Sequence, residues 1–478
     1  RQAVFNPHIT MKRLFSFSVL LLLALASWAQ AKYVFYFIGD GMGVNQVCGT
    51  ETYLASLEGR IGVTPLCMAK FPFTALSVTN SATNGVTDSA AGGSALSSGN
   101  KTKNGALGVL KDGVTRVPSV AELARDKGKA VGVATSVSID HATPAAFYAH
   151  VENRSMHNKI GHQMIEAGFD FYAGSDFLQA VNKEDSTEAD LYTLTANAGY
   201  TIAKGYKDFQ KKAKKAERML LLQSDKANAK DHSALPYAID RTKNDMSLAE
   251  ITRAGISFLT KKDKGNGFFF FIEGGKIDWA CHANDAATVF KEIIDMDEAV
   301  RVAYEFYEQH PDETLIVITA DHETGGVGLG TGAYKLNLSV LAHQRMSSAD
   351  YTAHIRKMRE EYGHNLTWPF MQNDLKENWG FWDKIPLTDH QSQRLQRAFE
   401  ALMNGMGQGS KTLYQQDDAL CDAARRTMQE IALTGWVSTG HSNGIVPVFA
   451  IGAGADRFTG MIENIDIPKR IIEAADLK

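Results

Sequence analysis

The chain has 478 residues, of which 44% are hydrophobic and 22% charged, and its formal net charge is −4. This length accommodates one large domain or about two to three average ones, and the composition is that of an ordinary globular protein. The slightly negative charge gives no indication of nucleic-acid-specific binding. The four cysteines lack CxxC spacing, which argues against a thiolate zinc site.

The first predicted element is a segment for export. Residues 11–31 read MKRLFSFSVLLLLALASWAQA, with a basic start, an apolar core short for a bilayer and a small-x-small end. We expect a signal peptide, preceded by upstream residues 1–10, and a periplasmic or extracellular mature protein without a membrane span. A buried first helix is the alternative. Export would permit a disulfide, for which Cys48 and Cys67 are the closest pair in sequence.

Continuous apolar runs alternate with helical segments along the rest of the chain. Runs without polar alternation are typical of strands buried on both faces, so we expect an α/β fold with a mostly parallel central sheet sandwiched between helices. Residues 331–430 instead carry helical periodicity, which predicts a helical insertion near the C-terminal third of a catalytic domain spanning 32–478. The expected strands are 33–38, 130–138, 268–275, 314–323 and 446–454.

Metal-type side chains lie at the ends of these expected strands. In open α/β sheets ligands bind beyond the carboxyl ends of the strands. Each of these side chains alone is ordinary loop chemistry, but together they predict zinc plus a harder ion such as magnesium. They are Asp40, Glu273, Asp278 with His282 four residues later, Asp321, His322 and His441.

The stretch TDSAAGG, residues 87–93, places Ser89 between Asp88 and a run of small residues. We expect a helix that begins near Ala90 and presents free N–H groups to an anion, with small side chains that let the ligand approach closely. Ser89 as a plain N-cap is the alternative. Beside a metal cluster, a metal-activated serine nucleophile is favoured, and no G-x-S-x-G elbow surrounds it.

The segment HATPAAFYAHVENR, residues 141–154, adds two further candidates. Thr143 offers a neutral oxygen ligand. Arg154 offers a planar fork that matches two non-bridging phosphate oxygens, although a surface ion pair would be the simpler role for it.

These motifs together resemble those of the alkaline phosphatase family, over nearly the whole mature chain. The resemblance implies an α/β sandwich that hydrolyses phosphate monoesters of many kinds through a phosphoserine at a site of two zinc ions and one magnesium. It also implies a homodimer, as is common in the family. The motifs, in the order of the family, are IGDGMG, VTDSAAGGSALSSGNKTKNGALGV, HATPAAFYAHVENR, IEGGKIDWACHAND, TADHETGG and STGHSNGIVPV.

The same resemblance implies a role for each matching residue. Ser89 would be the nucleophile, Arg154 would clamp the phosphate and Asp88 would orient Arg154. The first zinc would be held by Asp278, His282 and His441, the second by Asp40, Asp321 and His322, and magnesium by Asp40, Thr143 and Glu273.

Two positions depart from the pattern of some family members. His141 stands where some carry an aspartate near the magnesium, and Trp279 where some carry a lysine near the phosphate. We therefore expect activity to depend on added magnesium. A phosphodiesterase, sulfatase or mutase of the same fold is the nearest alternative, and a non-catalytic binding protein on this scaffold is a more distant one.

Overall fold

The computed structural model describes residues 30–185, 187–332 and 334–478. The predicted signal peptide therefore lies almost entirely outside the described residues. Within the described ranges, no helix is long and apolar enough to cross a membrane.

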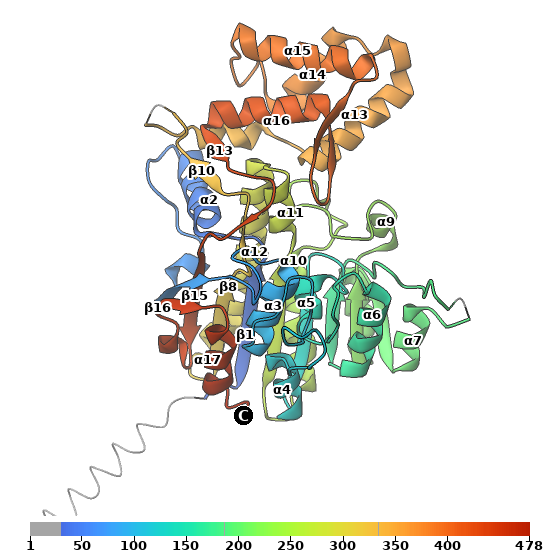
Figure 1. Cartoon of the computed structure of the whole chain (residues 1–478), viewed down its shortest axis with the longest axis vertical. Coiled ribbons are helices and arrows are strands. Elements are labelled where there is room, and N and C mark those ends of the chain that lie inside the picture. Colours follow the sequence, from blue (N-terminus) through green and yellow to red (C-terminus); the bar gives the residue numbers. More distant parts are fainter. Residues whose placement is uncertain (1–29, 186, 333) are drawn as a thin grey trace, which may run out of the picture.

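A ten-stranded mixed sheet forms the centre of the molecule (Figure 1). Its order is β16-β2-β15-β8-β1-β7-β3-β4-β6-β5, and every neighbouring pair is parallel except the two that involve β15. The expected α/β class with a mostly parallel sheet is thus confirmed. The strands are β1 (Tyr33–Gly39), β2 (Phe73–Val78), β3 (Ala130–Thr135), β4 (Phe171–Gly174), β5 (Tyr200–Lys204), β6 (Arg218–Leu222), β7 (Phe268–Gly274), β8 (Thr314–Thr319), β15 (Val446–Gly452) and β16 (Gly460–Glu463).

The central strands are buried on both faces, which explains their uninterrupted apolar sequences. In β1, Phe35 and Phe37 belong to one hydrophobic core, while Val34 and Tyr36 belong to a second core on the other face. This division follows the period of two along a strand. The sheet therefore separates two cores, each of which needs its own layer of helices.

Helices α10 (Leu248–Lys262) and α12 (Ala286–Gln309) contribute to the first core. Helices α4 (Val120–Asp126), α6 (His157–Ala167) and α17 (Asp466–Ala474) contribute to the second. The other helices of this part are α2 (Val44–Leu57), η1 (Met68–Lys70), α3 (Ser89–Ser98), α5 (Ala142–Ala145), α7 (Leu191–Asn197), α8 (Tyr206–Lys212), α9 (Asp225–Asn228), α11 (Lys276–His282) and η4 (Ala455–Arg457).

Between β10 (Val327–Leu329) and β13 (Thr434–Trp436), which pair with each other, the chain forms a mainly helical segment at the top of Figure 1. Asp285, at the start of α12, accepts hydrogen bonds from Gln344 Nε2 at 3.0 Å and from Ser348 N at 2.9 Å, and so joins this segment to the sheet layer. The segment comprises η2 (Leu338–His343), α13 (Ser348–Tyr362), η3 (Gly363–Asn365), α14 (Trp368–Trp379), α15 (Asp389–Met403), β11 (Gln408–Lys411), β12 (Gln416–Asp418) and α16 (Ala419–Ala432).

All four cysteines are free in the structure. Cys48 is exposed on α2, whereas Cys67 is buried before η1. The pairing that their closeness in sequence suggested is therefore not formed.

Candidate active site

The parallel register of the central strands brings three carboxylates to one edge of the sheet. Ile38 of β1 lies opposite Glu273 of β7 and opposite Thr319 of β8. Asp40 and Asp321, which follow β1 and β8 by one and two residues, therefore meet Glu273 at the carboxyl ends of these strands. This is the edge at which open α/β sheets bind ligands.

The remaining ligand types reach the same edge by two other routes. Asp278 and His282 lie four residues apart in α11, so one helical turn places them on the same side. His441 precedes β15, and it would lie at the wrong edge if β15 were parallel. Because β15 is antiparallel to β8, its start lies beside the carboxyl end of β8.

Three groups of side chains have ligand atoms that all lie within 4.8 Å of one another. The first two groups have the members that the resemblance implied for the two zinc ions. The third contains His141 beside Asp40 and Glu273, and Thr143 Oγ1 donates a hydrogen bond to Asp40 Oδ2 at 3.3 Å. The groups are Asp278–His282–His441, Asp40–Asp321–His322 and Asp40–His141–Glu273.

Backbone carbonyls determine which ring nitrogen of two histidines carries the proton. His282 Nδ1 lies 2.5 Å from Thr439 O, and His441 Nδ1 lies 2.9 Å from Thr87 O. A carbonyl oxygen can only accept, so both Nδ1 atoms must donate. In the neutral form of each ring, Nε2 would then carry a lone pair, and this is the form that binds metals.

His322 has the same tautomer for a related reason. The Thr324 hydroxyl lies 3.1 Å from His322 Nδ1 and donates its own proton to Asp278 Oδ1 at 2.6 Å. The Thr324 oxygen must therefore accept from His322 Nδ1, which leaves Nε2 of His322 free. Threonine at 324 is a positioning residue that the sequence did not identify.

The free Nε2 atoms face groups that repel their lone pairs. His282 Nε2 lies 3.2 Å from His441 Nε2, and His322 Nε2 lies 3.2 Å from Asp321 Oδ2. Lone pairs and carboxylates at these distances repel one another unless a proton or a metal ion lies between them. In the described part of the chain, buried carboxylate oxygens of the same groups also lack a hydrogen-bond donor: Asp40 Oδ1, Glu273 Oε1, Asp278 Oδ2 and Asp321 Oδ2. The donor set of nitrogen and oxygen ligands therefore fits divalent metal ions.

The pKa values of three of these buried carboxyl groups and of His141 are consistent with a site for divalent metal ions. Burial, together with neighbouring carboxylates, raises the pKa of Asp321 to about 8 and also raises the pKa of Asp40. Burial raises the pKa of Glu273 to about 7. For His141, burial and then Arg154 lower the pKa to about 3, so its ring is neutral and able to bind a metal.

Ser89 lies at the N-terminus of α3, fully buried and facing the second ligand group. The N-cap is Asp88, whose Oδ1 accepts from Ala91 N at 3.0 Å, and Ser89 is the first helical residue. The alternative in which Ser89 is a plain N-cap is therefore wrong. Its hydroxyl lies 3.4 Å from His322 Nε2, so it is available for chemistry at the positive end of the helix.

Asp88 also connects this helix to Arg154. Asp88 Oδ2 accepts from Gly105 N at 3.0 Å and from Arg154 Nη1 at 3.4 Å. Arg154 Nη2 in turn lies 3.3 Å from His141 Nε2. The guanidinium is thus held between the capping residue, which directly precedes Ser89 in the chain, and the third ligand group.

Two residues that the sequence did not identify also contact the site. Thr135, at the end of β3, donates a short hydrogen bond to Glu273 Oε2. Tyr414, in the loop between β11 and β12, stacks on Trp279 with ring centroids 4.4 Å apart. Neither residue belongs to a run of ligand types in the sequence, so no local pattern marks it.

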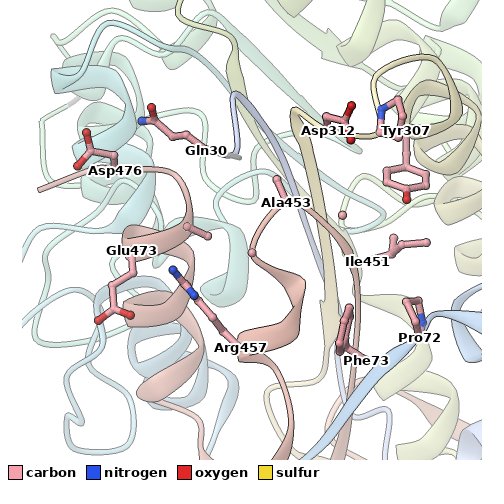
Figure 2. A pocket seen from close by; sticks show the side chains of 14 residues that line it. Gln30, Pro72, Phe73, Tyr307, Asp312, Ile451, Ala453, Arg457, Glu473 and Asp476 are labelled. Atoms are coloured by element: carbon pink, nitrogen blue, oxygen red, sulfur yellow. The ribbon is translucent and has the colours of Figure 1, made fainter. Parts of the chain in front are cut away.

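A separate cavity of about 650 Å³ opens at the opposite edge of the sheet (Figure 2). Gly452 ends β15 opposite Leu315 near the start of β8, so this cavity lies at the amino ends of the parallel strands. Side chains of Arg457, Glu473 and Tyr307 line it. None of the three ligand groups of the described residues lies there.

A mixed α/β sheet with a serine and clustered metal-type side chains at its carboxyl edge has the arrangement that metal-assisted hydrolysis requires. Comparison with known proteins gives the particular family. The alkaline phosphatase family model matches residues 31–477. The chain therefore belongs to the alkaline phosphatase family and is a phosphoric monoester hydrolase, as the sequence motifs predicted.

Relatives of known name are similar over most of their length. Alkaline phosphatase 3 of Bacillus subtilis is 31% identical over 93% of this chain and 89% of its own. The solved cold-active enzyme of Shewanella sp. is 26% identical over 93% and 99% of the two chains, with a TM-score of 0.75. A TAB5 enzyme from an Antarctic bacterium, solved as a His-to-Asp variant with magnesium in a site called M3, is 26% identical over 94% and 98%, with a TM-score of 0.64.

Proposed function

We propose that the chain hydrolyses phosphate monoesters through a phosphoserine on Ser89, at a centre of two zinc ions and one magnesium. The observation that carries this proposal is the convergence of the Nε2 lone pairs of His282, His441 and His322 on buried carboxylates beside the Ser89 hydroxyl. When bound, the ions stabilise charge on the attacking and leaving oxygens and lower the pKa of bound water.

In the first step Ser89 Oγ attacks phosphorus and the bond to the alcohol oxygen breaks, while the serine proton is transferred, directly or through water, to the leaving oxygen, so that the alcohol is released. In the second step water attacks the phosphoserine, which releases inorganic phosphate and restores the hydroxyl. Arg154 binds two non-bridging oxygens with its planar fork, and the N-terminus of α3 stabilises the same charge. Asp88 holds Arg154 in place through the contact at 3.4 Å.

We infer which ion each ligand group would hold from the chemistry of its donors. Asp278, His282 and His441 would hold one zinc, and Asp40, Asp321 and His322 the other, because nitrogen and oxygen ligands suit zinc. Asp40, Glu273 and the Thr143 hydroxyl would hold magnesium, which prefers oxygen.

His141 is the exception in the magnesium group, since its imidazole favours zinc over magnesium. We infer that activity depends on added magnesium. His141→Asp should raise magnesium affinity in calorimetric titration and reduce the dependence on added ion. Full activity of the dialysed parent protein without magnesium would contradict this inference.

The direct test of the mechanism is Ser89→Ala, with Ser98→Ala at the other end of α3 as the matched control. Each protein would be assayed with p-nitrophenyl phosphate and acid-quenched with labelled substrate to detect phosphoserine. We expect Ser89→Ala to lose activity by about 10⁴-fold or more and to carry no label, whereas Ser98→Ala retains both. Label that remains in Ser89→Ala would contradict the assignment of the nucleophile.

A phosphodiesterase of the same fold is the alternative activity. It is tested by comparing p-nitrophenyl phosphate with bis-p-nitrophenyl phosphate on the same metal-loaded protein. A higher kcat/KM for the diester would favour the alternative.

We also propose that the protein is exported and assembles as a homodimer, with 331–430 as an insertion in a catalytic domain of 32–478. Export is supported by residues 11–31 of the sequence, and cell fractionation tests it. The homodimer is supported by its frequency in the family, and light scattering of the purified protein tests it.

A further inference from the structure

Tyr414 reaches the candidate active site from the mainly helical segment, far along the chain from every predicted ligand except His441. Its ring stacks on Trp279 at 4.4 Å with an interplanar angle of 15°. It meets the ring of His282 edge-on at 5.4 Å and lies 6.3 Å from the ring of His141. These three neighbours belong to the metal-ligand groups or stand beside them.

The hydroxyl of Tyr414 lies near the phosphate clamp. The stack on Trp279 places the Tyr414 ring beside the first ligand group, and electrostatic interactions connect its hydroxyl with Arg154. Arg154 binds the phosphoryl group in the proposed function, while His282 belongs to the first zinc group. The ring of Tyr414, which packs against His282 and Trp279, therefore borders the space in which the phosphoryl group would be held.

The hydrogen-bond capacity of this hydroxyl is only partly used. A guanidinium can only donate, so towards Arg154 the tyrosine oxygen acts as acceptor. Among the described residues, the phenolic proton has no assigned acceptor. It is thus free to be donated to an anionic oxygen.

The loop that carries Tyr414 is held in place by polar contacts that are partly or fully buried. Gln415 Nε2 donates to Ser348 Oγ of α13 at 2.8 Å, and Asp418 N donates to Thr352 Oγ1 of the same helix at 3.1 Å. Arg425 of α16 donates to Asp417 Oδ2 at 3.2 Å. These contacts pre-organise the loop, as a substrate-binding residue requires.

We propose that Tyr414 is a substrate-contacting residue that donates a hydrogen bond from its hydroxyl to a non-bridging oxygen of the phosphoryl group. This inference rests on the proposed function of the same site. Tyr414 would add a neutral hydrogen-bond donor next to Arg154. It would do so on the side of the site where Trp279 replaces the lysine that some family members carry. Because the phosphoryl group is common to all monoesters, the contribution is independent of the leaving alcohol.

The test compares Tyr414→Phe, which removes only the hydroxyl, with Tyr414→Ala, which also removes the stack on Trp279. The control is Leu413→Ala, at the exposed neighbouring position of the same loop. Inorganic phosphate binding to the metal-loaded proteins would be measured by calorimetry, and kcat/KM with p-nitrophenyl phosphate and glycerol phosphate.

We expect Tyr414→Phe to weaken phosphate binding by about 10-fold, the effect of one hydrogen bond to a charged group. Its kcat/KM should fall by the same factor for both substrates, and Leu413→Ala should match the parent. Unchanged phosphate binding in Tyr414→Phe would overturn the inference, as would a loss that differs between the two substrates. If the parent protein binds phosphate but hydrolyses neither substrate, the proposed function fails, while the binding comparison still decides the role of Tyr414.

Discussion

Gly92 lies in the first turn of α3, directly beside the backbone of a predicted zinc ligand. A Cβ atom at this position would lie 3.0 Å from Asp321 O, 3.1 Å from Asp321 Cβ and 3.4 Å from Thr87 Cγ2. The first two distances are shorter than a normal carbon contact, so Gly92→Ala must displace either α3 or Asp321 by a few tenths of an ångström.

Two opposing contributions determine the effect of Gly92→Ala on stability. Alanine in place of glycine within a helix stabilises by about 1 kcal/mol, whereas an extra methyl group in a packed core costs about 1–3 kcal/mol. We therefore expect a free energy of unfolding that is unchanged or lower by up to about 2 kcal/mol. The displacement falls on a metal ligand and on the helix that carries Ser89, so kcat/KM should fall further, by roughly 10- to 100-fold.

The assay combines urea unfolding, zinc competition with a chromophoric chelator and kcat/KM for p-nitrophenyl phosphate. Gly85→Ala is the matched control, because a Cβ there would meet no atom within 4 Å. We expect Gly85→Ala to retain zinc affinity and activity. Zinc affinity and turnover in Gly92→Ala equal to those of the parent protein would contradict this expectation.

Further predictions concern the buried polar groups. Asp297 accepts from two backbone N–H groups, so Asp297→Ala should lower the free energy of unfolding by about 2–4 kcal/mol in urea titrations, with kcat unchanged. Removing metal with a chelator should lower the Tm of the protein, because the ligand groups repel one another without an ion between them, and added zinc should restore the Tm. A Tm that does not respond to the chelator would argue against the metal centre. Asp285→Ala should expose the mainly helical segment to proteolysis, since this carboxylate joins Gln344 to α12. Burial alone would lower the pKa of His150, but its hydrogen bonds with Glu122 and Gly108 have the larger effect, so the pKa of His150 is raised. Burial alone would raise the pKa of Glu122, but the hydrogen bond with His150 contributes to a net lowering. A raised histidine pKa stabilises the fold below about pH 6.5, and a lowered glutamate pKa stabilises it above about pH 4.5. Glu122→Gln should therefore lower the free energy of unfolding at about pH 5.5, by roughly 0.5 kcal/mol after solvent screening, and change it little at about pH 8.5. Equal losses at both pH values in urea titrations would contradict this prediction.

Many of the candidate metal ligands could be predicted because they occur in short, recognisable sequence patterns. Asp40 and Asp321 stand directly after apolar runs, and a run that is apolar throughout indicates a strand buried on both faces. Asp278 and His282 are four residues apart, which places them on one side of a helix. The structure brings these residues together as ligand groups.

Other members of the site have no such pattern. Threonine is a common residue type, and the role of Thr135 and Thr324 follows only from their hydrogen-bond partners. Thr135 bonds to Glu273, and Thr324 bonds to His322. Tyr414 lies in a short loop without periodicity, and its partners come from a distant part of the chain. Such contacts depend on how segments pack, which a local pattern cannot indicate.

Residue order and hydrophobic pattern were therefore sufficient to predict the α/β class, the family and the types of ligand. The antiparallel direction of β15 is visible only in the folded chain, because an apolar run has the same pattern in either direction. That reversal is what brings His441 to the carboxyl edge. The structure also decided that Asp88 and not Ser89 caps α3, since both residue types cap helices equally well and only the hydrogen bond to Ala91 distinguishes them.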